Sequence, residues 1–182
     1  MTQFAADFGA VIATNAGFFG VTSSGVGVEY SLAAANSTLL SHNIETLTRS
    51  GVHYNPTRCA FGFDDTDIPD AYWVYKSDSG GTWAYDSPSM NSQSGDPKPT
   101  PNSTYPGVAS DWVLTSGVGG GPMLVFESSN VALASFDAEV MWGSGVPSTV
   151  AAPRTAIGYG VPQSLGLTSE HLLWIVVDGV ND

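Results

Sequence analysis

The feature that most constrains the fold is an uninterrupted apolar run, Leu172–Val177, which ends at Asp178. The run is far shorter than the roughly 20 apolar residues that a membrane-spanning helix needs. Its length, its β-branched residues and its polar flanks predict a strand that is buried on both faces. Arg154 opens the preceding segment, so we expect a guanidinium and a carboxylate at strand ends, framing a site for an anionic, oxygen-rich substrate.

A short pattern occurs twice in the chain, once in each half. Arg58–Phe63 and Arg154–Tyr159 both read Arg-x-Ala-apolar-Gly-aromatic, and each precedes a turn and an aromatic or apolar strand. The pattern predicts two hairpins of one antiparallel or mixed sheet, with the arginines entering at the same edge. A single pair of copies leaves chance as an alternative explanation.

An acidic turn, Asp64–Asp70, joins Arg58–Phe63 to the predicted strand Tyr72–Tyr75. Its spaced carboxylates are ligands that calcium uses. The turn lacks the glycine and the closing glutamate of a helix-loop-helix calcium site. A solvated turn is therefore favoured, and no metal is assigned to it.

The middle of the chain gives weaker signals. Residues 2–10 are predicted to form a short helix, and Ser31–Thr48 is predicted to be either helical or irregular. Residues 76–108 are rich in Ser, Gly, Pro, Asn and Asp, which predicts one long polar loop. Three aromatic residues lie in that loop, Trp83, Tyr85 and Tyr105. They suit stacking on a sugar, or they anchor the loop to the body of the protein.

A glycine-rich stretch, Gly117–Pro122, is predicted to lead into a strand at Met123–Phe126. Three consecutive glycines, Gly119, Gly120 and Gly121, allow a close approach of the backbone to a ligand and offer amide donors to an anion. The stretch is not a P-loop, because no Gly-Lys-Ser/Thr follows it.

The whole chain of 182 residues suits one domain. The predicted fold class is α+β, a twisted and mostly antiparallel sheet with few short helices. A net charge of −12 argues against nucleic acid and against anionic membrane surfaces as partners. The only cysteine, Cys59, precludes an intrachain disulfide and is expected to be a buried, inert thiol. The Ser/Thr/Asn/Gly-rich, Lys-poor composition suggests an extracellular or cell-surface protein whose leader is absent from this chain.

Four motifs resemble, in order and rough spacing, the phosphodiester glycosidase domain. They are Asn15-Ala16-Gly17-Phe18-Phe19, Gly119-Gly120-Gly121-Pro122-Met123-Leu124-Val125, Arg154-Thr155-Ala156-Ile157-Gly158 and Val176-Val177-Asp178-Gly179. That domain removes N-acetylglucosamine from a phosphodiester to uncover mannose 6-phosphate, and its bacterial relatives are often labelled exopolysaccharide-biosynthesis proteins. The family domain usually extends beyond both ends of the present chain, so we expect residues 1–182 to be an incomplete domain. Part of its site is then missing, or a second chain or a further copy supplies it.

The resemblance implies hydrolysis of the sugar C1–O bond of a sugar phosphodiester on a glycan or exopolysaccharide. Arg154 would hold the phosphate, and Asp178 would support the oxocarbenium ion or activate water. Asn15 would orient Asp178 through a hydrogen bond. Gly119, Gly120, Gly121 and Thr155 would contact the substrate. No cofactor is expected, although a requirement for a divalent cation such as calcium is left open.

Simpler interpretations of the same residues remain open. Arg154 could be a structural partner of a carboxylate, and Asp178-Gly179 could form a hairpin turn. Asn15 could be present because asparagine tolerates the backbone conformation of a glycine-rich turn. The chain as a whole could instead be a self-assembling surface protein whose sheet is completed by a neighbouring copy. A third interpretation is a carbohydrate-binding module that uses the loop aromatics.

Overall fold

The computed structural model describes residues 17–145 and 150–179. They fall into a larger unit, residues 17–150, and a smaller unit whose described part is residues 151–179. The predicted helix at residues 2–10, the motif residue Asn15 and the last three residues of the chain lie outside the described residues.

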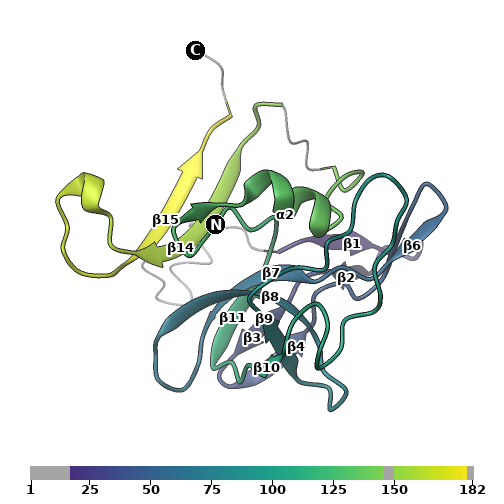
Figure 1. Ribbon diagram of the computed structural model, residues 1–182, viewed down its shortest axis with the longest axis horizontal. Coiled ribbons are helices and arrows are strands. Elements are labelled where there is room, and N and C mark those ends of the chain that lie inside the picture. The colour runs from purple at the N-terminus through teal and green to yellow at the C-terminus, as the bar shows by residue number, and fades with distance from the viewer. Residues whose placement is uncertain (1–16, 146–149, 180–182) are drawn as a thin grey trace. The chain divides into compact units, whose positions relative to one another are not determined.

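The larger unit is built on a seven-stranded antiparallel sheet with the strand order β10-β9-β8-β7-β11-β3-β4 (Figure 1). Its strands, in chain order, are β3 (Ala33–Ala35), β4 (Thr38–Ser41), β7 (Arg58–Phe63), β8 (Pro69–Lys76), β9 (Thr82–Tyr85), β10 (Ser110–Asp111) and β11 (Ser116–Gly119). The predicted fold class, a mostly antiparallel sheet with few short helices, is confirmed.

Short elements surround this sheet in the same unit. They are the strand pairs β1 (Phe19–Val21) with β2 (Gly27–Glu29), β5 (Leu47–Arg49) with β6 (Val52–Tyr54) and β12 (Val125–Phe126) with β13 (Ser129–Asn130), and the helix α2 (Ala132–Ala138). No helix in the described part of the chain is both long enough and apolar enough to cross a membrane.

The smaller unit contains an antiparallel hairpin, β14 (Arg154–Gly160) and β15 (His171–Val177), with a turn of 3-10 helix, η1 (Gln163–Leu165), between the strands. Both predicted hairpins are confirmed, since β7 pairs with β8 as well. The expectation that they share one sheet is wrong, because among the described residues β14 and β15 pair with each other and not with the seven-stranded sheet. Burial of Leu172–Val177 on both faces is also wrong, since Trp174 is 38% exposed and Val176 is 71% exposed.

The prediction of a helix or irregular structure for Ser31–Thr48 is wrong, because this segment contains β3 and β4 and the start of β5. The alanines of β3 favour helix in isolation, but pairing with β11 and β4 outweighs that preference. The turn that joins β3 to β4 consists of Asn36 and Ser37, both with positive φ, at 51° and 57°. This backbone is that of a two-residue hairpin turn, which asparagine tolerates well.

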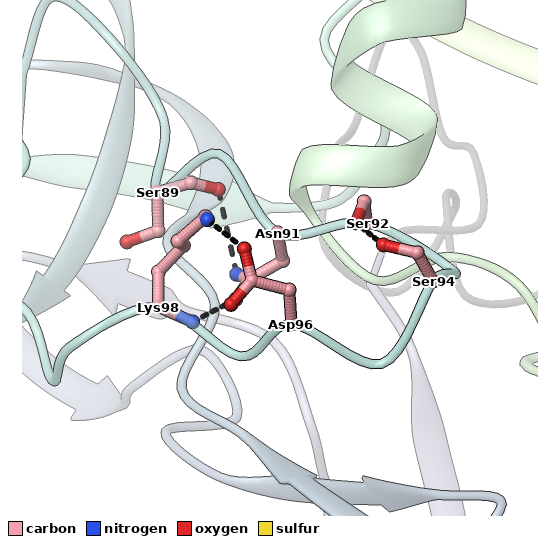
Figure 2. Close-up of polar contacts among 6 residues, drawn as sticks. All are labelled: Ser89, Asn91, Ser92, Ser94, Asp96 and Lys98. Carbon is pink, nitrogen blue, oxygen red and sulfur yellow. Dashed lines mark hydrogen bonds and ion pairs between the residues drawn. The ribbon is translucent and has the colours of Figure 1, made fainter.

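The predicted loop at residues 76–108 is interrupted by β9, in which Trp83 and Tyr85 are buried. Both aromatics therefore belong to the interior and are withdrawn as sugar-stacking candidates. The loop after β9 is ordered by its own polar groups, as Figure 2 shows. Asn91 Nδ2 donates to the carbonyl oxygen of Ser89 at 3.4 Å, and Asn91 Oδ1 accepts from the backbone N–H of Lys98 at 3.0 Å.

The core of the larger unit has two parts. One consists of buried residues of the sheet and its connections, namely Leu32, Ala34, Ala60, Val74, Ala84, Trp112 and Leu114. The other packs Val140, which follows α2, against Leu47 of β5 and Tyr54 of β6. The larger unit also buries several polar side chains, including Asn43, Arg58 and Glu139.

Candidate functional site

Arg154 and Asp178 lie at the open end of the β14–β15 hairpin. Arg154 is the first residue of β14 and pairs with Val177, the last residue of β15, so that Asp178 follows one position beyond Arg154's partner. Thr155 pairs with Val176. The Arg154 Nη1 group donates to the carbonyl oxygen of Pro153 at 2.9 Å. The hairpin register thus brings the backbones of the two predicted catalytic residues to one end of the same sheet.

The glycine motif belongs to the larger unit, where Gly119 is the last residue of β11. The sequence predicted a turn before a strand, but the glycines themselves end a strand. The Gly119 N–H donates to the Leu32 carbonyl at 2.7 Å, and the Gly120 N–H donates to the Cys59 carbonyl at 3.0 Å. Two of the three amides expected to hold an anion are therefore used in hydrogen bonds inside the protein.

A close approach of buried polar side chains explains why glycines occupy this segment. A Cβ atom on Gly119 would lie 2.2 Å from Asn43 Oδ1, and one on Gly121 would lie 2.8 Å from Glu139 Oε2. Both distances are far shorter than van der Waals contact, so any larger residue would displace the polar group. A Cβ on Gly120 would meet nothing within 4 Å.

Asn43 is buried and connects two strands that do not pair with each other directly. Its Oδ1 accepts from the backbone N–H of Leu32 at 2.8 Å. Its Nδ2 donates to the carbonyl oxygens of Arg58 at 3.1 Å and Cys59 at 3.2 Å. The side-chain amide thus satisfies backbone groups on both sides of Gly119, as a short stretch of strand would.

Glu139 follows α2 directly and is completely buried. Its Oε1 accepts from Trp73 Nε1 at 2.9 Å and from the Met123 N–H at 2.8 Å, and its Oε2 accepts from the Cys59 N–H at 3.2 Å. One carboxyl group therefore ties together β7, β8 and the segment that follows the glycines. We call Asn43, Arg58 and Glu139 the polar framework.

Arg58, the first residue of β7, is 4% exposed. Its Nε donates to the carbonyl oxygen of Glu139 at 3.2 Å and its Nη2 to that of Val140 at 3.4 Å. The guanidinium carbon lies 5.6 Å from the centre of the Phe18 ring, a cation–π distance. Phe18 belongs to the Asn15–Phe19 motif, so one described residue of this motif contacts the framework.

The backbone is strained beside the framework. Val140 has a φ of +54°, which is unusual for a β-branched residue and costs on the order of 1–3 kcal/mol. The surroundings hold this conformation, because Arg58 binds the Val140 carbonyl and the side chain is fully buried against Leu47 and Tyr54. A strained residue next to buried charged groups is a common mark of functional sites.

Burial raises the pKa of Glu139 to about 7, and the three hydrogen bonds and the nearby Arg58 partly offset this effect. Burial and the same carboxyl group also raise the pKa of the Cys59 thiol well above its usual value. A raised pKa disfavours the reactive thiolate. Cys59 is partly rather than fully buried, and the inertness expected from the sequence stays a prediction. Glu139 is completely buried, so solvent does not reach its carboxyl group. In this structure the carboxyl group holds two backbone N–H groups and the Trp73 indole N–H in place.

Sequence reasoning missed Asn43 and Glu139 and assigned no role to Arg58. A signal existed for Glu139, because this carboxylate is followed directly by three apolar residues, Val140, Met141 and Trp142. A signal existed for Arg58 in the repeated Arg-x-Ala pattern. Asn43 carries no local signal, since its partners are 11 to 16 residues away in the chain.

The acidic turn between β7 and β8 is exposed and forms a solvated turn, in which Asp64 Oδ1 accepts from the Thr66 N–H at 2.8 Å. No group of three or more His, Cys, Asp or Glu residues suited to a metal ion occurs within residues 17–145 and 150–179.

Comparisons with protein-family models, with curated proteins and with solved structures find no match to this chain. The resemblance to the phosphodiester glycosidase domain therefore depends on the four sequence motifs alone.

The framework predicts a large loss of stability on substitution of one glycine and almost no change on substitution of its neighbour. Gly119→Ala is expected to destabilise the larger unit by about 3 kcal/mol, because its Cβ would displace the Asn43 amide. Gly120→Ala, whose Cβ meets only open space, should change stability by less than about 0.5 kcal/mol. Urea unfolding of both variants measures this difference. Equal stabilities would show that Asn43 does not lie against β11.

The raised pKa of Glu139 predicts a specific pH dependence of stability. A carboxyl whose pKa is about 7 in the folded state, against 4.5 when unfolded, binds more protons in the fold, so stability falls as pH rises between these values. Between pH 5 and pH 7 the loss should be about 2 kcal/mol.

Glu139→Gln provides the test of this pH dependence. The variant should be less stable by about 1–3 kcal/mol, because its amide NH₂ would face the Cys59 N–H. It should also lose the fall in stability between pH 5 and pH 7. Identical pH profiles of the unfolding free energy for the variant and the natural protein would show that Glu139 does not titrate in this window.

Proposed function

We propose that this chain is a hydrolase domain that cleaves the sugar C1–O bond of a sugar phosphodiester, on a glycan or an exopolysaccharide. The register of the β14–β15 hairpin is the observation that supports this proposal most. It brings Arg154 and Asp178, the only pair of opposite charges among the four motifs, to one end of the same sheet.

The chemistry suits this pair. Cleavage of the C1–O bond expels a phosphate monoester, which leaves much more readily than a sugar alcohol and needs less help from a general acid. The protein then has to hold the phosphate and to stabilise positive charge that develops on the sugar. Arg154 would bind two phosphate oxygens through its planar guanidinium, with Thr155 beside it. Asp178 would face the anomeric carbon or activate the attacking water.

The other two motifs contribute residues to the larger unit. Two of the four motifs, Asn15–Phe19 and Gly119–Val125, contribute residues that pack around Arg58 and Glu139. A contact of Gly119, Gly120 and Gly121 with the substrate is implied only by the resemblance of their motif. Asn15 would orient Asp178 or the substrate.

Arg154→Ala should lower kcat/KM on an N-acetylglucosamine 1-phosphodiester by at least about 100-fold, because the phosphate loses its cation. Asp178→Asn should lower kcat to a similar extent. The matched control is Lys98→Ala, which also removes one positive charge but lies in the polar loop paired with Asp96. The assay measures release of N-acetylglucosamine and of the phosphate monoester. Full activity of Arg154→Ala would remove Arg154 from the site.

Self-assembly is a second candidate, favoured by the exposed strand β15. Leu172, Trp174, Ile175, Val176 and Val177 are all at least 38% exposed. Apolar side chains exposed along one strand are a feature that favours pairing with a neighbouring copy.

Val176→Lys is expected to abolish assembly that uses β15, because it places a charge on the most exposed residue of the strand. The control is Leu133→Lys, at an 80% exposed position on α2 of the larger unit. Size-exclusion chromatography with light scattering reports the outcome. A natural protein that stays monomeric at all concentrations would eliminate this candidate.

A further inference from the structure

We propose that Asn36 and Asn102 are acceptors for N-linked glycans, and that the two glycans protect the two edges of the seven-stranded sheet. This proposal is independent of catalysis. It depends on the extracellular location that we expect from the composition.

Both asparagines begin the acceptor sequence Asn-Ser-Thr, which requires a residue other than proline in the middle and a hydroxyl at the third position. Both lie on the surface in tight turns. Asn36, Ser37 and Thr38 are all exposed, and so are Asn102, Ser103 and Thr104.

The side chain of Asn102 is held in an orientation that leaves its nitrogen available. Its Oδ1 accepts from the Thr104 N–H at 2.9 Å, from Thr104 Oγ1 at 2.9 Å and from the Tyr105 N–H at 3.1 Å. Its Nδ2 donates to no group among the described residues. The amide nitrogen, to which a glycan is attached, therefore points away from these bonds.

The positions of the two acceptors relative to the sheet are the main structural argument. The edge strands of the sheet are β4 and β10 (Figure 1). Thr38, the third residue of the first acceptor, is also the first residue of β4. In the second acceptor sequence, the backbone carbonyl oxygen of Ser103 accepts a hydrogen bond from the N–H of Ala109, the residue just before β10.

Exposed apolar side chains lie next to both acceptors. Leu40 on β4 is 64% exposed, and Val108, two residues before β10, is 83% exposed. Unpaired edges with apolar side chains promote pairing with other chains, and proteins usually cover or charge them. A hydrated glycan at each edge would provide this cover in a chain with few charged residues.

The modification is a glycosyl transfer from a lipid-pyrophosphate-linked oligosaccharide. The asparagine Nδ2 forms a bond to C1 of the oligosaccharide, and the bond from C1 to the pyrophosphate oxygen breaks. One Nδ2 proton passes to a base of the transferase, and the lipid pyrophosphate leaves.

The test is secretion of the whole chain from a eukaryotic host, followed by intact mass measurement and glycopeptide mapping. Enzymatic deglycosylation converts each occupied asparagine to aspartate and so identifies it. We expect a glycan on both asparagines. Thr38→Ala and Thr104→Ala should each remove one glycan, whereas the hydroxyl-retaining controls Thr38→Ser and Thr104→Ser should retain both. Occupancy of only one site, or of neither, in the secreted natural chain would overturn the proposal.

The protective role has its own measurement. Association of the glycosylated and the enzymatically deglycosylated protein is followed by light scattering, in the Val176→Lys background so that contacts through β15 do not contribute. We expect the deglycosylated protein to associate several-fold faster. Equal rates would overturn the claim that the glycans protect the sheet edges.

Discussion

The larger unit depends on one buried carboxyl group. Glu139 receives hydrogen bonds from β7, from the indole of Trp73 on β8 and from Met123 after the glycine segment, and these groups are far apart in the chain. A buried carboxyl without such partners would be very costly, whereas one with three donors holds several backbones in a fixed arrangement. The arrangement leaves no space for a side chain on Gly121, and Asn43 imposes the same requirement on Gly119. The glycine motif thus has a packing explanation that is independent of any ligand.

The sequence predicted the parts of the fold that depend on local patterns. The β7–β8 and β14–β15 hairpins follow from alternating and apolar runs that are joined by turns, and their registers include the predicted arginines at the strand ends. Partners distant in the chain determined the rest. Ala33–Ala35 has no strand preference of its own and is a strand because β11 and β4 pair with it. Trp83 appeared to be a loop aromatic because its neighbours are polar, yet pairing of β9 with β8 buries it.

The candidate site shows the same division. Arg154 and Asp178 were identified from their positions at strand ends, and the hairpin register agrees with that placement. Asn43 and Glu139 were not identified, because their importance lies in contacts with residues between 11 and 80 positions away. The amide cradle was predicted from composition alone, and sheet hydrogen bonds from Gly119 and Gly120 now account for two of its three donors. The proposed function therefore uses the end of the β14–β15 hairpin, whereas the contacts of the polar framework are accounted for by the packing of the larger unit.

Hydrogen exchange of the Gly119 and Gly120 amides tests this account most directly. If Asn43 and Glu139 hold β11 as described, both amides should exchange only when the larger unit unfolds, at rates that match its global stability. Rapid exchange of either amide, comparable with that of the exposed Gly95 in the polar loop, would contradict this account. It would mean that the amide is available to bind an anion.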